Sequence, residues 1–584
     1  MLVLFFSVNG QIYLDYIGAG HSDGITITSS AFEEGGEPSN VINGSGMDAR
    51  AMEASRFLAQ TTLGYDLNMV NALKEELDFE AWLDNQIQIS PSNMLEKANT
   101  IWDEVLALHV AAGEDPDEVF GPNQLHFNYA WWELNMTNED LLRQRIAFAL
   151  SQIFVISMNS DLSEHIDGVA DFYDILINNS FGNFEDMLMQ VSLHPAMGYY
   201  LSHLNNPRED TANNIHPDEN YAREIMQLFS IGLYELNQDG TRKKDQDGND
   251  IPTYDNSHIK KFAQVFTGLG PGDINDMVDW TDEPYFGLSI YGADMTSPMK
   301  MYEPFHEKDE KELLNGFVLP ANNPGMLDVE QTVNHLFNHE NVGPFLALRL
   351  IQRLVKSNPS PDYISRVAGV FNDNGQGTRG DMAAVVKAIF LDSEARDCTP
   401  QSDDKHGRLR EPIVRLLQYS KSLTLDSPSG RYWHNGYEAV ERFKQFPLNS
   451  PTVFNFYNYD HAPVGDLSTA GLFAPEFKIH DTGTSINYIN KSYQWNYWDA
   501  LWWSWHNDYG IENVAIVTDD LEAMAENPET ILNHLDIMYT HGQLTDRTRQ
   551  YIREGVNLDV WDEWGVTRTL LYLLQISPDY NIVK

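Results

Sequence analysis

The chain has 584 residues, of which 42% are hydrophobic and 12% aromatic, so it can bury a large core and is not a disordered polymer. Its 86 Asp and Glu outnumber its 38 Lys and Arg, which gives a formal net charge of -48. A field of that sign repels nucleic acid and anionic membrane surfaces, so a nucleic-acid-binding protein is disfavoured. Cys398 is the single cysteine, which excludes a disulfide scaffold and a multi-cysteine zinc site.

The first residues, MLVLFFSVNGQ, contain an apolar run typical of the tail of a secretory signal, although the basic segment that normally precedes it is absent. We expect residues 1–11 to be a truncated signal peptide and the mature protein to be exported, either periplasmic or extracellular; the alternative is a short apolar strand. Residues 12–47 are rich in Gly and Ser and predict an extended arm or linker. No later stretch approaches the roughly 18 apolar residues of a membrane-spanning helix.

Apolar residues recur three and four positions apart from Asp48 onward, as in ARAMEASRFLAQTTLG, EDLLRQRIAFALSQIFVIS and GDMAAVVKAIFLDSEAR. This spacing predicts helix after helix, and neither a strand–helix alternation nor a fixed-period repeat accompanies it. We therefore expect an all-α protein in which residues 48–584 form one large domain, divisible into two lobes. Residues 236–310 are less regular and predict an insert with a small β-hairpin and long loops.

Within this insert, DQDGNDIPTYD places Asp245, Asp247 and Asn249 at spacings that resemble a calcium-binding loop. The match is incomplete because no glutamate stands where such a loop needs its bidentate carboxylate. The Asp-Gly pair is followed by β-branched and aromatic residues, and the preceding LNQDGTRKK offers a second strand. This pattern favours a hairpin over a calcium site.

Several ordered blocks together resemble the bacterial domain-of-unknown-function 1800 family. These blocks are ASRFLAQTTLG (54–64), LRQRIAFALSQIFVIS (142–157), FGNFEDMLMQVSLHPAMGYYLS (181–202), PDENYAREIMQLFSIGLYELNQDG (217–240), FAQVFTGL (262–269), LREPIVRLLQ (409–418) and SPTVFNFY (450–457). The resemblance implies an exported bacterial protein, often encoded beside a protein of the domain-of-unknown-function 1501 family, which is similar to metal-dependent alkaline phosphatases and sulfatases. That neighbour is a candidate partner, and no reaction is implied.

The block beginning at Pro217 is the family's most recognisable part and predicts a helix with a polar face. Glu219, Arg223 and Gln227 form one row at four-residue spacing, and Asn220 and Glu224 form the adjacent row. If the face is buried, carboxylates around an arginine tune each other's pKa for acid–base chemistry, which makes Glu219, Arg223 and Glu224 catalytic candidates. If it is exposed, the same residues are the solvated side of an amphipathic helix.

A second candidate site is EPFHEKDEKELLNG, residues 303–316, where the resemblance implies a His-Asp-x-Gly-x-Lys run. His306 and Lys311 occupy the His and Lys places, whereas the Asp place holds Glu307. His306 is a further catalytic candidate and, with Glu303 and Glu307, a candidate ligand set for a divalent metal ion. The alternative is a single exposed histidine in an acidic loop.

The segment SYQWNYWDALWWSWHNDY, residues 492–509, is densely aromatic. Trp495, Trp498, Trp502 and Trp505 follow helical spacing and predict a buried stripe. The surplus rings, Tyr497 and Trp503 among them, predict a surface that stacks on sugar faces or on a protein partner.

Two classes of function follow from these patterns. The first is a metal-assisted enzyme, or enzyme subunit, that acts on envelope or extracellular polymers and uses the residues of the 219–224 helix together with His306. The second is a non-catalytic binding or assembly protein that works with its neighbour-encoded partner or with polysaccharide. A cleft shared by His306 and the 219–227 helix would favour the enzyme, and separate, exposed groups would favour the binding protein.

Overall fold

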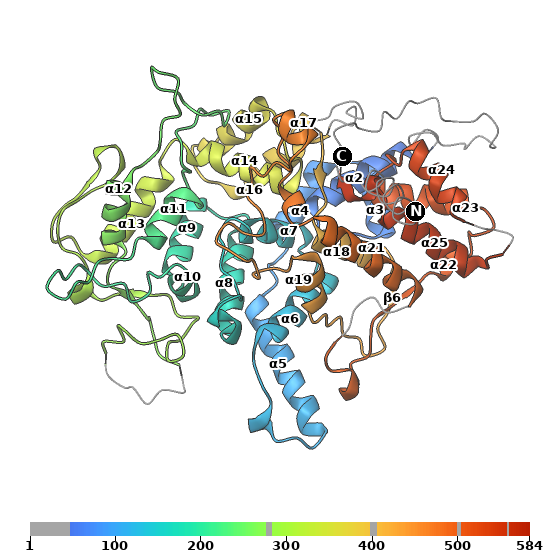
Figure 1. The fold of residues 1–584 in the computed structure, drawn as a ribbon, viewed down its shortest axis with the longest axis horizontal. Helices are drawn as coiled ribbons and strands as arrows, with labels where there is room; N and C mark the ends of the chain where they lie inside the picture. Colours follow the sequence, from blue (N-terminus) through green and yellow to red (C-terminus); the bar gives the residue numbers. More distant parts are fainter. Residues whose placement is uncertain (1–46, 276–282, 397–405, 499–503, 557–559, 584) are drawn as a thin grey trace, which may run out of the picture.

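The computed structural model describes residues 47–275, 283–396, 406–498, 504–556 and 560–583 (Figure 1). The predicted signal peptide, nearly all of the predicted arm, Cys398 and Trp503 lie outside these residues. In the described part helices predominate and strands form only short two-stranded pairs, which confirms the expected all-α class. None of the described helices is both long and apolar enough to cross a bilayer.

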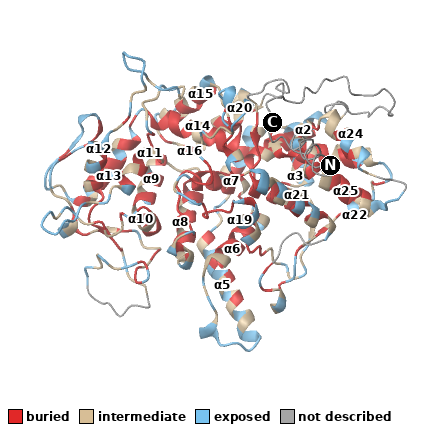
Figure 2. Ribbon diagram, in the orientation of Figure 1, coloured by how far each residue is buried: buried red, intermediate tan, exposed pale blue. Residues whose placement is uncertain are grey.

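In the described residues of the N-terminal third, helices joined by loops are the regular elements, and aspartates start its first helices. The side chains of Asp48, Asp66 and Asp78 each accept backbone N–H groups of the following turn, which caps those helices. The elements are α2 (Ala49–Thr61), α3 (Leu67–Glu76), α4 (Phe79–Gln88), α5 (Met94–Ala111), a 3₁₀ turn (Pro116–Glu118), α6 (Gln124–Thr137), α7 (Leu141–Ser151), a 3₁₀ turn (Asp161–Glu164), α8 (Ile166–Asn179), α9 (Phe184–Leu193) and α10 (Pro195–Tyr200). Helix α5 projects from the body, and its far end is exposed (Figure 2).

The middle of the chain combines helices with short strands and loops. Its elements are α11 (Asn220–Gln227), α12 (Asn256–Val265), β1 (Leu269–Gly270), β2 (Lys300–Met301), a 3₁₀ turn (Glu303–Phe305), β3 (Lys311–Glu312), a 3₁₀ turn (Leu314–Gly316), β4 (Val318–Leu319), α13 (Gly325–Phe337), α14 (Val342–Leu354), α15 (Pro361–Asn372), α16 (Met382–Leu391) and α17 (Ser393–Arg396). Strand β1 pairs with β2 and β3 with β4, both antiparallel.

The hairpin predicted in the insert is confirmed. Bridges join Leu236 to Arg242 and Lys244 to Asp250, and each connection is a tight turn that contains Asp-Gly. The side chain of Asp245 accepts the N–H groups of Asp247 and Asn249 at 2.9 and 2.8 Å, so this carboxylate is used to hold its own turn.

The C-terminal part returns over the N-terminal helices. Its elements are β5 (Arg408–Leu409), α18 (Pro412–Lys421), β6 (Thr424–Asp426), α19 (Tyr437–Phe443), α20 (Asp466–Thr469), a 3₁₀ turn (Pro475–Lys478), α21 (Thr482–Tyr497), a 3₁₀ turn (Asn507–Tyr509), β7 (Ala515–Val517), α22 (Asp519–Glu522), α23 (Pro528–Leu535), a π-helix (Asp536–Thr540), α24 (Asp546–Glu554), α25 (Glu563–Gln575), α26 (Pro578–Asn581) and β8 (Ile582–Val583). Strand β5 pairs with β8 and β6 with β7, again antiparallel.

Helices α9–α13 lie at one end of the molecule and α21–α25 at the other, with α7, α14, α16 and α18 between them (Figure 1). One continuous set of buried apolar side chains runs from Ala51 to Tyr580 through both ends. The first described helix closes against the last part of the chain: Ser55 donates to the carbonyl of Ile537, and the Tyr65 hydroxyl donates to the carbonyl of Met538 at 2.8 Å. The division into lobes stays a prediction.

Candidate functional site

Helix α11 carries the polar face that the sequence singled out, and the structure divides that face in two. Glu219 and Arg223 form an ion pair at 3.5 Å with 39% of each side chain exposed, and Asn220 is exposed. Gln227 is half-buried and accepts a hydrogen bond from the Tyr254 hydroxyl at 3.1 Å. Most of the predicted cluster is therefore the solvated side of an amphipathic helix.

Glu224 is the exception on this helix. Its side chain is buried, and its Oε2 atom has no hydrogen-bond partner among the described residues. Burial raises the pKa of Glu224 to about 7, although the positive charge of Arg223 opposes the shift. A carboxyl group with that pKa is able to give or take a proton near neutral pH.

His306 lies in a second buried group, which we call the Asp328 cluster: His306, Lys311, Asn323 and Asp328. The His306 ring is fully buried; Nδ1 donates to the carbonyl of Thr267 at 2.8 Å, and Nε2 lies 3.1 Å from Asp328 Oδ2. Lys311 Nζ donates to the same carboxylate oxygen at 2.8 Å. The expected exposed histidine is therefore wrong, because this ring anchors the loop to α13.

The partners of Asp328 hold it in its charged form. Burial alone would raise the pKa of Asp328, but hydrogen bonds from His306, Lys311 and Asn323 outweigh burial and leave its pKa below the usual value. Gly268 allows the backbone at His306 to pack closely against it. Its φ is +83°, and a Cβ there would lie 2.9 Å from the backbone nitrogen of His306.

The predicted metal ligands do not converge. Glu303 accepts the N–H of Gly325 at 2.8 Å and pairs with Lys308, while the Glu307 carboxylate accepts the N–H groups of Lys308 and Asp309. Both nitrogens of His306 are engaged, so neither offers a lone pair to a metal ion. In the described parts of the chain, no group of three or more His, Cys, Asp or Glu side chains is arranged to hold a metal ion.

His306 and α11 belong to the same end of the molecule without sharing an opening. Asn206 links them, since its side chain accepts the N–H of Asp218 at 2.9 Å and its carbonyl accepts the N–H of Gly268 at 2.8 Å. The His306 ring is fully buried, whereas Glu219 and Arg223 face solvent. The geometry that would have favoured a joint metal-assisted site is therefore not found among these groups.

The aromatic segment is placed differently from the expectation. Helix α21 ends at Tyr497; Trp495 is buried, but Trp498 is 65% and Trp505 55% exposed, so the predicted buried stripe is wrong at these two positions, and Trp502 lies outside the described residues. The chain leaves the helix there, and helical spacing no longer applies. Trp503, the other predicted binding residue, lies outside the described residues.

Rings from α21 and α25 meet at the surface, and we call this the aromatic face: Tyr493, Tyr497, Trp564 and Tyr572. Tyr493 is 45% exposed and stacks on Tyr497 with centroids 4.6 Å apart. Tyr497 also meets the edges of Trp564 at 5.8 Å and Tyr572 at 6.2 Å. A hydrogen bond of 2.7 Å between the Tyr497 hydroxyl and Thr569 fixes its ring. The exposed Trp498 follows directly in the chain.

A third buried group, which the sequence did not reveal, lies at the centre of the molecule. We call it the Glu411 cluster: Arg145, Gln152, Arg353, Arg408, Glu411, Gln445, Tyr457 and Glu476, all buried. Glu411 Oε1 accepts hydrogen bonds from Gln152 at 2.7 Å and from Gln445 and Tyr457 at 2.6 Å. Burial would raise the pKa of Glu411, but the positive charges of Arg408, Arg145 and Arg353 hold it below its usual value.

Other atoms of the Glu411 cluster lack partners among the described residues. These atoms are Nε and Nη1 of both Arg145 and Arg408, Oε2 of Glu411 and both carboxylate oxygens of Glu476. Arg408 Nη1 lies 3.7 Å from Glu411 Oε2 and 4.0 Å from Glu476 Oε1, beyond direct hydrogen-bond distance. Burial raises the pKa of Glu476 to about 7 and lowers that of Arg145 to about 9.

Comparison with known proteins gives one match. Residues 56–582 match a family described as a protein of unknown function, DUF1800. The chain belongs to the DUF1800 family. This confirms the resemblance drawn from the sequence blocks. No curated protein and no solved structure matches the sequence.

Three of the blocks that carry the DUF1800 resemblance contribute to the Glu411 cluster, namely 142–157, 409–418 and 450–457. A signal was present in the middle block. Glu411 precedes Pro412 at the start of α18, where its side chain makes no cap hydrogen bond and turns instead to the cluster. Glutamate is not a preferred residue for capping a helix, so its presence before Pro412 indicates that the carboxylate has partners other than the helix N-terminus.

Proposed function

We propose that this DUF1800 protein is an exported binding protein that holds uncharged polysaccharide on the aromatic face. The observation that supports this proposal is the contact between four aromatic rings of α21 and α25. One of these rings, Tyr493, is 45% exposed, and Trp498, which follows α21, is 65% exposed. Flat amphipathic rings stack on the apolar faces of sugars. The net charge of -48 argues for a neutral polymer, because an anionic one is repelled.

The fixed geometry of these rings supports a role in ligand binding rather than a chance exposure of aromatic side chains. Tyr497 is held by Thr569 and packed by Tyr572 and Trp564, so little side-chain freedom is lost when a ligand stacks there. Tyr493 extends this support to the open surface. Export, which places the protein among extracellular polymers, is part of the proposal and rests on the apolar start of the sequence.

The test is depletion of the full chain from solution by insoluble neutral glucans and chitin, with the Tyr493→Ala, Trp498→Ala double variant beside the parent. We expect the parent to bind and the double variant to bind at least about tenfold more weakly, which corresponds to about 1.4 kcal/mol. Tyr437→Ala, which removes a 54% exposed tyrosine from α19, is the matched control and should bind as the parent does. No binding by the parent, or equal loss in the control, rejects the proposal.

Acid–base catalysis at Glu224 is the second candidate function, and the buried carboxyl with a free Oε2 favours it. Glu224 would act as a general acid or base, without a metal ion, on a sugar unit that enters on the buried side of α11, because its carboxylate does not face the solvent side of that helix. Release of reducing ends from the bound polysaccharide should then follow a pH profile with a change near 7. Glu224→Gln should abolish it and Glu219→Gln should not; activity retained in Glu224→Gln excludes this role.

A further inference from the structure

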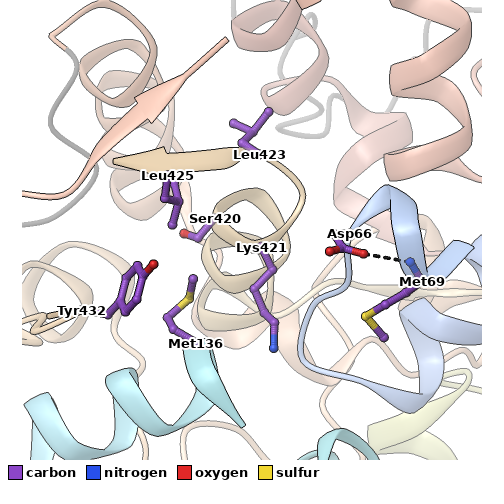
Figure 3. A pocket seen from close by; sticks show the side chains of 8 residues that line it. All are labelled: Asp66, Met69, Met136, Ser420, Lys421, Leu423, Leu425 and Tyr432. Atoms are coloured by element: carbon purple, nitrogen blue, oxygen red, sulfur yellow. Dashed lines mark hydrogen bonds between the residues drawn. The ribbon is translucent and has the colours of Figure 1, made fainter. Parts of the chain in front are cut away.

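A small pocket lies between the start of α3, the ends of α6 and α18, and strand β6. The cavity measures about 200 Å³, and Met69, Met136, Leu423 and Leu425 give it apolar walls. Lys421, the last residue of α18, extends into this region between Met136 and Asp66 (Figure 3). A space of this size with one amino group suits a ligand of a few heavy atoms.

The amino group of Lys421 is held in place. Nζ donates to the carbonyl of Asn135, in the last turn of α6, at 2.8 Å. The stem passes close to Gly64, where an added Cβ would lie 3.1 Å from Lys421 Cδ. A lysine side chain normally samples many rotamers, so contacts at both its stem and its tip fix the direction of the nitrogen lone pair.

The surroundings also favour the uncharged amine. Burial lowers the pKa of Lys421 to about 8, although the charges of Asp66 and Asp140 oppose the shift. An ordinary exposed lysine has a pKa of about 10.4, so at neutral pH the fraction of free amine at Lys421 is on the order of a hundredfold larger. A free amine against apolar walls is a nucleophile.

We propose that this pocket binds a small aliphatic aldehyde or ketone, which condenses with the amine of Lys421 to form an imine. The nitrogen lone pair attacks the carbonyl carbon and gives a carbinolamine. Its hydroxyl group and the remaining N–H proton then leave as one water molecule, which forms the C=N bond. Hydrolysis reverses the step and releases the ligand. The aliphatic chain lies against Met136, Leu423 and Leu425, and the site is independent of the aromatic face.

The probe is butanal, added to the full chain at pH 7.5 with sodium cyanoborohydride, which reduces an imine to a stable secondary amine. Peptide mapping by mass spectrometry then gives the rate of modification at each lysine. We expect Lys421 to be modified at least about tenfold faster than the exposed Lys444, with a rate that saturates as butanal increases. Modification of Lys421 no faster than Lys444 overturns the proposal.

A pocket-filling variant separates binding from simple reactivity. Met136→Phe keeps Lys421 but occupies the cavity, so the rate at Lys421 should fall to that of Lys444 while the circular dichroism spectrum stays that of the parent. Leu425→Phe on β6 serves the same purpose if the first variant does not fold. Lys421→Arg keeps the positive charge and should abolish the fast adduct. An unchanged rate at Lys421 in a folded, filled variant overturns the proposal.

Discussion

The Asp328 cluster and the Glu411 cluster both contain buried charged side chains, and they differ in how completely those charges are partnered. The Asp328 carboxylate lies within hydrogen-bond distance of the side chains of His306, Lys311 and Asn323. In the Glu411 cluster, Oε1 of Glu411 also accepts several hydrogen bonds. Glu476 and two arginines, however, have polar atoms without hydrogen-bond partners among the described residues. Buried charged groups are therefore fully hydrogen-bonded in the Asp328 cluster and only partly hydrogen-bonded in the Glu411 cluster.

The difference shows what a buried ion can do in this fold. A saturated cluster fixes backbone segments, here the 303–311 loop against α13, since every displacement breaks a charged hydrogen bond. A cluster with free donors and acceptors needs water to satisfy them and keeps groups that can exchange protons. We therefore expect the two clusters to respond differently to mutation and to pH.

The largest effect is expected for Glu411→Ala. This change leaves Arg145, Arg353 and Arg408 without their central counter-charge and removes the acceptor of three hydrogen bonds, which should lower the free energy of unfolding by about 4 kcal/mol. Urea denaturation measures it, and Glu441→Ala, on the exposed side of α19, is the control. A loss under about 1 kcal/mol would show that water, and not Glu411, balances these arginines.

Asp328→Ala should cost somewhat less, about 3 kcal/mol, because it leaves the buried ammonium of Lys311 without its carboxylate and Nε2 of His306 without its hydrogen-bond partner. The same urea denaturation measures it. Adding Lys311→Met should recover part of the loss, since one unpaired charge is then replaced by an apolar chain. If the double variant is as unstable as the single one, Lys311 is not paired with Asp328 in solution.

Glu476 and Asp328 should also show opposite pH dependences. The folded pKa of Glu476, about 7, lies above its ordinary value of 4.5, so its contribution is fully present below about pH 4.5 and is lost as the pH rises through 7. Asp328, whose pKa is lowered, contributes above its ordinary pKa of 3.8 and loses that stability as the pH falls.

Glu476→Gln isolates the first effect. It should match the parent near pH 4.5 and exceed its unfolding free energy at pH 8 by on the order of 3 kcal/mol. Urea denaturation of both proteins across this range measures the difference. A gap between them that stays constant with pH would mean that Glu476 titrates normally.

Arg223→Ala gives the baseline for both clusters. Its ion pair with Glu219 is 39% exposed on each side, so its loss should change the free energy of unfolding by less than about 0.5 kcal/mol. Thermal or urea denaturation measures it. A cost above about 1 kcal/mol would place Arg223 among the buried charges and revive a polar cluster on α11.

The sequence predicted the helices well and the buried polar groups poorly, for physical reasons. Periodic apolar spacing marked α16 because one face of that helix packs on the core, whereas α7 is buried on all sides and its apolar content alone marked it. Periodicity does not report where a helix stops, so it carried the aromatic stripe past Tyr497 to the exposed Trp498. It also does not report burial of a polar side chain, which separated Glu224 from its exposed neighbours on α11.

Sequence reasoning could single out Glu411 but not the rest of the Glu411 cluster, because the members of the cluster are brought together only by the tertiary fold. Gln152, Glu411 and Gln445 come from distant parts of the chain and touch within 2.7 Å. Local pattern carries no information about such pairs. The same holds for His306, whose partner Asp328 lies on another element and whose burial reversed the exposed-loop interpretation.

The contact between the first described helix and the last part of the chain determines when that helix can complete its packing during synthesis. Ser55 and Tyr65 emerge from the ribosome long before Ile537 and Met538, to which they are hydrogen-bonded. Strand β5, beside Glu411, likewise waits for Ile582 and Val583. Contacts so distant in sequence form slowly, because a large loop must close first. Helix α2 meets α3 and α4 soon after synthesis, but the side that faces residues 536–541 stays uncovered, and a nascent chain of this protein should need a chaperone until its last helices are made.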